Sequence, residues 1–166
     1  MSLVAVRVTI WLSVLAWVAA EWQRTHPAAA AASGRAAWTL GAVTALAHAA
    51  MAFDAHHAWS HAAALADTAR QTALVTGLRW GGGLYVNYAF LAVWSADALW
   101  WWLGPGSFRR RPGTLDAAVR AFLWFMFFNG AFVFVHGPMR WAGAAAALAV
   151  AAAWYRRRGQ KGREHG

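Results

Sequence analysis

Apolar residues dominate five long segments of the chain, and each segment is bounded by polar residues, glycine or proline. These segments cover roughly residues 3–20, 37–57, 83–103, 117–136 and 139–155. A helix needs about 20 mostly apolar residues to cross the hydrocarbon core of a bilayer. The pattern therefore predicts an all-α integral membrane protein, a bundle of about five transmembrane helices, with residues 1–155 forming a single transmembrane domain.

The connections between these segments carry their own signals. Residues 21–36 read as a polar loop, and Gly137-Pro138 predicts a tight helical hairpin between the last two segments. Residues 58–82 are more polar than the segments around them and predict an interfacial helix of about four turns between spans two and three. We expect the run Gly81-Gly82-Gly83 to end that helix. Residues 156–166 form a basic tail that is predicted to be disordered.

Composition strengthens the membrane assignment. Hydrophobic residue types make up 60% of the chain and charged types 13%, and there are 13 tryptophans. A soluble domain averages about 25% charged residues, and tryptophan favours the boundary between membrane and water. Although the formal net charge is +9, the basic residues cluster at the ends of the apolar segments. Membrane topology explains that placement, so we expect the lipid bilayer as a partner and no nucleic acid.

The distribution of basic residues predicts the orientation, because arginine and lysine favour cytoplasmic loops. In a five-span chain one side carries the residues Arg24, Arg35, Arg109, Arg110, Arg111 and the basic tail, and the other side carries Arg70, Arg79 and Arg140. The expected orientation is therefore N-terminus out and C-terminus in, in the cell (inner) membrane as a multi-pass protein.

A competing interpretation treats residues 1–20 as a cleaved signal peptide that ends at Val18-Ala19-Ala20. We disfavour it because no basic residue precedes Arg7 and because cleavage would place the run Arg109–Arg111 on the outer side.

The stretch FDAHHAWSHAA, residues 53–63, is the main candidate for chemistry. On a helix that continues past Trp59, the side chains of Asp54, His57 and His61 fall within one narrow arc on successive turns. Two histidines at i and i+4 can share a metal ion, and a carboxylate on the same face can bind it or orient an imidazole. We therefore predict a metal site at the outer end of the bundle.

Other residues join this site only if the five-span topology is right. His56 and His136 are further candidate metal ligands, and Tyr85 and Asn87 are supporting candidates that could bind a cofactor or a ligating histidine. The missing cysteines exclude thiolate ligands, so zinc, iron, copper or manganese would be held by nitrogen and oxygen. If the site is catalytic, the metal would activate water or an oxidant against an apolar or lipid-like substrate.

Several alternatives stay open. A b-type haem could sit between His136 and either His56 or His57, and clustered histidines at a helix end can also simply contact water and lipid headgroups. A different class of function is a non-catalytic scaffold or assembly subunit, whose run Trp100–Trp102 and Ala-rich fifth segment would face a partner or another copy of the chain. A small transporter is a third option.

Three polar residues are expected deeper in the bundle, namely His48, Asp97 and Asn129. His48 and Asp97 could form a proton path toward the outer cluster, or these residues could form hydrogen bonds that fix the helices, which is the interpretation we favour. At that depth Asp97 must be protonated, paired or near the inner surface, and His48 is one candidate partner. Asn87 shares a helix face with Trp94 and Asp97, so we expect it to face the bundle interior.

Overall fold

The computed structural model describes residues 3–24 and 30–130, together with the six positions 141, 145, 148, 151, 152 and 155. The described chain is helical, with α1 (Leu3–Gln23), α2 (Ala30–His57), α3 (His61–Thr76), α4 (Gly83–Leu103), α5 (Pro105–Arg109) and α6 (Gly113–Phe128). No strand occurs within these ranges. The all-α prediction is therefore confirmed for this part of the chain.

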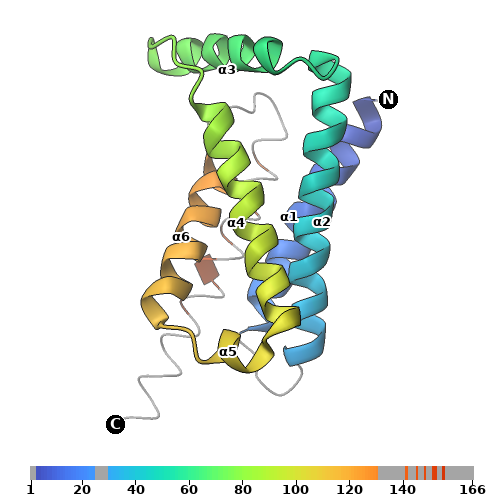
Figure 1. The fold of residues 1–166 in the computed structure, drawn as a ribbon, viewed down its shortest axis with the longest axis vertical. Helices are drawn as coiled ribbons and strands as arrows, with labels where there is room; N and C mark the ends of the chain where they lie inside the picture. Colours follow the sequence, from blue (N-terminus) through green and yellow to red (C-terminus); the bar gives the residue numbers. More distant parts are fainter. Residues whose placement is uncertain are drawn as a thin grey trace.

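The helices form an upright bundle with one helix lying across its end (Figure 1). The antiparallel helices α1 and α2 make the most extensive contact, α4 packs on α2, and α6 packs on α4. The short α5 lies at the end where α1 finishes and α2 begins, whereas α3 lies across the opposite end. The chain thus has two distinct ends, and the candidate site belongs to the end that carries α3.

By length and composition, two of the described helices could cross a membrane, namely α1 and the Ser33–His57 part of α2. The other three predicted spans are not among the helices identified in this way. The predicted fourth segment is described only as far as residue 130, and the predicted fifth segment and its Gly137-Pro138 hairpin lie outside the continuously described ranges.

The predicted helix between the second and third segments is present as α3, whose 16 residues make about four turns. Its predicted end at Gly81–Gly83 is wrong. The helix stops at Gly77, which adopts a left-handed conformation with φ of 78° and donates its N–H to the Ala73 carbonyl at 2.9 Å. Glycine reaches this conformation without steric cost, so Gly77 provides the cap.

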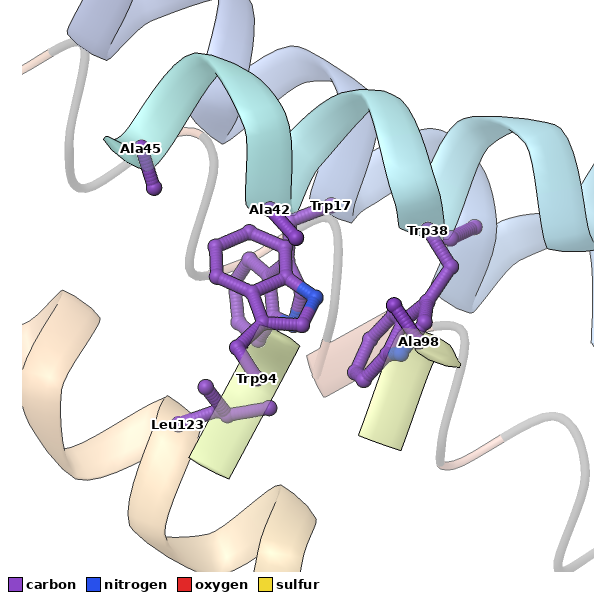
Figure 2. Packing of buried hydrophobic residues seen from close by; sticks show 8 residues of the cluster. Trp17, Trp38, Ala42, Ala45, Trp94, Ala98 and Leu123 are labelled. Carbon is purple, nitrogen blue, oxygen red and sulfur yellow. The ribbon is translucent and has the colours of Figure 1, made fainter. Parts of the chain in front are cut away.

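The core is built from large indole rings that pack against small residues. Trp17, Trp38 and Trp94 are 3%, 1% and 0% exposed, and alanines on α2 and α4 allow the rings to lie close to the backbone. Figure 2 shows Trp94 of α4 lying beside Ala42, with Trp17 of α1 behind it. The small residues Gly41, Ala42 and Ala45 on this part of α2 allow the three helices to approach closely around the Trp94 ring.

Gly41 marks the closest approach in this core. A Cβ atom at that position would lie 2.5 Å from the ring of Trp94, which has no room to move because it is fully buried. On α1, the Ser13 hydroxyl donates to the Gly41 carbonyl at 2.9 Å, which fixes α1 against α2 at the same level.

The second core feature is a buried cluster of charged residues at the α5 end. Its members are Glu21 and Arg24 of α1, Asp97 of α4, Arg111 of the α5–α6 connection, and Asp116 and Arg120 of α6. The three carboxylates and three guanidinium groups cancel in formal charge. Glu21, Asp97 and Arg120 are only 2%, 5% and 8% exposed. Because water does not reach these charges, their opposite charges must stabilise one another.

Asp116 is the centre of this cluster. Its carboxylate accepts from Arg24 at 3.1 Å and from the Nε of Arg120 at 3.0 Å, and it also pairs with Arg111. Arg120 in turn pairs with Glu21. The cluster therefore ties α1 to α6 through charges far apart in the sequence.

Asp97 attaches α4 and α2 to the same cluster. Its carboxylate pairs with Arg111 and accepts from the Trp38 indole N–H at 3.0 Å. Asp97 is therefore paired, which is one of the three expected states, but His48 as its partner is wrong. The His48 Nδ1 atom lies 2.9 Å from the Val6 carbonyl oxygen on α1. The interpretation that these residues fix the helices is the one that their contacts support.

We predict that Gly41→Ala destabilises the fold. Alanine favours a helix over glycine by about 1 kcal/mol, but the new methyl group would overlap the immobile Trp94 ring, and such overpacking costs about 1–3 kcal/mol. The free energy of unfolding in detergent should therefore fall. Gly113→Ala is the matched control, because its Cβ would meet nothing within 4 Å; equal stability changes in both variants would contradict the packing described.

We also predict that Glu21→Ala lowers the free energy of unfolding by about 3 kcal/mol, because it leaves the buried Arg120 guanidinium short of a counter-charge. The double variant Glu21→Leu with Arg120→Met should recover most of this loss, since both charges are removed together. Denaturant titration in detergent measures both effects. A double variant no more stable than Glu21→Ala would contradict the unpaired Arg120 charge as the cause of the loss and would point to the Arg120–Asp116 contact instead.

Candidate functional site

The local chain path at the candidate site differs from the one expected. Helix α2 ends at His57, Ala58 and Trp59 adopt positive φ values of 47° and 61°, and α3 begins at His61. The Ser60 side chain accepts from the Ala63 backbone N–H at 3.2 Å and caps the new helix. The prediction that one helix continues past Trp59 is therefore wrong, and His61 leaves the arc of Asp54 and His57.

A signal for this corner was present in the sequence. Serine is a preferred N-cap residue, and Ser60 directly precedes the start of α3. Ser60 could not be identified as a cap from the sequence, because the same apolar and histidine residues also fit a continuous helix.

His61 binds to the start of α4. Its Nδ1 atom lies 3.1 Å from the Tyr88 hydroxyl, and its Nε2 atom lies 3.4 Å from the Tyr85 hydroxyl. The structure thus brings Tyr85 to the predicted site, with Tyr88 as an additional contact. Asn87 is exposed, so the expectation that it faces the bundle interior is wrong.

His57 faces a carboxylate that the sequence analysis did not single out. Its Nε2 atom lies 4.0 Å from an Oδ atom of Asp67 on α3, and the two side chains are 17% and 19% exposed. Asp67 also pairs with Arg70 and accepts from the Gln71 amide at 2.9 Å. Asp67 follows His57 by ten residues, and only the turn between α2 and α3 brings the two together.

The remaining candidates surround this pair. An Oδ atom of Asp54 accepts from the Trp59 indole at 2.9 Å, so Asp54 supports the corner. His56 is exposed, with its ring centre 6.2 Å from that of His57. Phe53 joins the two halves of the site, because its ring centre lies 5.6 Å from that of His57 and 6.4 Å from that of Tyr88.

The three predicted ligands Asp54, His57 and His61 are thus directed to three different partners. Among the described residues, no group of three or more His, Cys, Asp and Glu side chains is placed to hold one metal ion. His136, the remaining candidate metal ligand and the haem partner of His56 or His57, lies outside the described residues. Metal binding and haem binding stay predictions.

Comparison with known proteins adds no second source of evidence, since the chain matches no family model, no curated protein and no solved structure. The function is therefore argued from the geometry of these residues.

We predict that Ala58→Gly leaves the free energy of unfolding unchanged or raises it by up to about 1 kcal/mol, because glycine accepts the positive φ without the cost that Ala58 bears. Ala55→Gly, within α2, should instead lower it by about 1 kcal/mol. Unfolding of both variants in the same detergent provides the measurement. Equal losses in the two variants would support a continuous helix and contradict the corner.

Proposed function

We propose that the chain is a five-span protein of the cell (inner) membrane, with its N-terminus outside, and that the α3 end of the bundle binds a transition-metal ion through His57 and Asp67. The observation that carries the metal assignment is the approach of an imidazole nitrogen and a carboxylate oxygen to 4.0 Å at a partly shielded position. Such nitrogen and oxygen donors suit zinc, iron, copper or manganese.

Membrane placement is supported by the exposed surfaces of the helices. Large apolar side chains are exposed along α1 and α2, among them Val8, Leu15, Leu40 and Val43. Helix α4 has 21 residues, which gives a length of about 31 Å, enough for a bilayer core. Its tyrosines and tryptophans lower its hydropathy, but these residues also favour membrane interfaces.

The orientation is supported by which residues share an end of the bundle. Arg24 and Arg35 flank the α1–α2 connection, and the run Arg109–Arg111 follows the end of α4, so all lie at the α5 end. Arg70 and Arg79 belong to the α3 end. The arginine-rich α5 end is therefore the cytoplasmic one in our proposal.

The metal assignment is compatible with the geometry of the pair. Zinc, for example, binds histidine nitrogen and carboxylate oxygen at about 2.0–2.2 Å, so two donors of one tetrahedral ion lie about 3.3 Å apart. The observed 4.0 Å requires a movement of less than about 1 Å. Gln71 already orients the carboxylate, and the Arg70 side chain, 69% exposed, can move aside into solvent.

Two protein ligands would leave coordination positions for another residue, with His136 as the candidate, and for water. A metal-bound water at the membrane surface is suited to attack an apolar or lipid-like substrate, which is the enzymatic form of the proposal. Tyr85 and Tyr88, which hold His61, would then lie on the neighbouring wall of the site.

We expect near-stoichiometric metal in detergent-purified wild-type protein from metal-replete cells, and its loss in His57→Ala and Asp67→Asn. His56→Ala is the matched control, because it removes an exposed neighbouring imidazole that makes no ion pair with a described carboxylate. Elemental analysis gives the metal content, and an optical spectrum of the same samples detects haem through a Soret band.

The outcomes separate the hypotheses. Metal that survives both His57→Ala and Asp67→Asn would contradict the assigned ligands, and a Soret band would reassign the site to haem. Wild-type protein without metal or chromophore would favour the scaffold function. All variants are compared by size-exclusion chromatography, so that a folding defect is not read as loss of a ligand.

The scaffold function is the second candidate, and one observation favours it: the Asp54–Trp59 hydrogen bond holds the corner and the His61–Tyr88 contact joins α3 to α4, which are structural roles for two of the predicted ligands. The run Trp100–Trp102 gives it less support than expected. Trp100 donates to Ser107 at 2.9 Å, Trp101 stacks on Phe108, and Trp102 donates to Thr39. Trp100 and Trp102 thus have hydrogen-bond partners within the chain, and Trp102 is also 50% exposed.

A further inference from the structure

An open groove of about 900 Å³ lies between α3 and the beginning of α4. Its floor is the apolar face of α3 that carries Leu65 and Ala66, and its other side is formed by Arg79 and Trp80 of the connection and by Tyr85 of α4. The groove therefore combines an apolar floor with a cation, an indole N–H and a phenol hydroxyl.

Two glycines give the groove its shape. A Cβ on Gly81 would lie 2.8 Å from the Leu65 carbonyl oxygen, and a Cβ on Gly82 would lie 2.1 Å from the Trp80 ring. A larger residue at Gly81 would push the connection away from α3, and one at Gly82 would displace the Trp80 ring. The glycine run is therefore required for close packing of the connection against α3 and for the position of the Trp80 ring.

The Arg79 guanidinium is available to a ligand, whereas the Tyr85 hydroxyl also contacts His61. Arg79 makes no ion pair or hydrogen bond with any other described residue, and it is exposed. Trp80 and Tyr85 are 57% and 55% exposed. Because α3 lies across the end of a bundle whose helices α1 and α2 are long enough to span a bilayer, this groove would be at headgroup level.

We propose that the groove binds one phospholipid molecule. Arg79 pairs with the phosphate, because guanidinium matches phosphate in charge and in hydrogen-bond geometry. Trp80 and Tyr85 contact the glycerol region, where aromatic rings with one polar end are favoured. The start of an acyl chain lies along the alanine-rich face of α3, which leaves room for it.

This inference rests on the membrane placement proposed above but not on the metal. Asp67 is adjacent to Ala66 in sequence, so on α3 its side chain points about 100° away from the groove. The lipid site and the His57–Asp67 pair can therefore succeed or fail separately.

The test is native mass spectrometry of the full chain, reconstituted in phosphatidylglycerol vesicles and then extracted into a mild detergent. We expect one retained phospholipid per wild-type chain. Arg79→Gln should lower the retained fraction about tenfold, and Ala66→Trp, which fills the groove from its exposed floor, should abolish retention.

Matched controls place a similar change outside the groove. Arg70→Gln removes an arginine of the same end of the bundle, and Leu74→Trp adds an indole to α3 at a position that is 81% exposed and does not line the groove. Both should retain lipid as the wild type does. Circular dichroism and size-exclusion chromatography confirm that all variants are folded.

Lipid retention by folded Ala66→Trp at the wild-type level would overturn the proposal, as would an equal loss in Arg70→Gln and Arg79→Gln. A dimer in place of a bound lipid would show that a second copy of the chain occupies the groove. Failure of wild-type protein to remain in carbonate-washed membranes would instead reject the membrane placement on which the proposal depends.

Discussion

The charge-neutral cluster of Glu21, Arg24, Asp97, Arg111, Asp116 and Arg120 is the constraint on which the described fold depends. Burying a charge without an opposite charge beside it costs several kcal/mol of folding free energy. Each member of the cluster therefore restricts where the others can lie. Because they come from α1, α4, the α5–α6 connection and α6, satisfying them brings these elements together at one end. Trp38 adds α2 through its bond to Asp97.

The position of α4 carries this constraint to the opposite end of the molecule. The C-terminal half of α4 is fixed by Asp97 and by the packing of Trp94 against Gly41. Its first turns carry Tyr85 and Tyr88, which contact His61. A rigid helix transmits a position over its whole length, so the candidate site is ordered partly by contacts at the far end of the bundle. The two ends of the bundle are thus related through the position of α4.

The corner between α2 and α3 has an unfavourable local backbone conformation, and contacts with other residues stabilise it. Ala58 and Trp59 adopt backbone conformations that cost non-glycine residues about 1 kcal/mol or more each. The Trp59–Asp54 hydrogen bond and the Ser60 cap offset that cost. What the corner achieves is the placement of Asp67 opposite His57 and of the apolar face of α3 beside Arg79, Trp80 and Tyr85.

The sequence by itself determined the helical class, the extent of α4, the presence of α3, and the gathering of histidine and tyrosine at one end. Those properties follow from apolar segment length and from helix geometry, which are local. The predicted loop over residues 21–36 is wrong in part, because α1 continues to Gln23 and α2 already begins at Ala30. Only the tertiary structure decided the ligand pairing, because a corner of three residues redirected His61 to Tyr88 and brought Asp67 to His57. It likewise decided that Arg111, not His48, meets Asp97. The pairing of buried charges depends on which helices become neighbours, and hydrophobic periodicity along one chain carries no information about that choice.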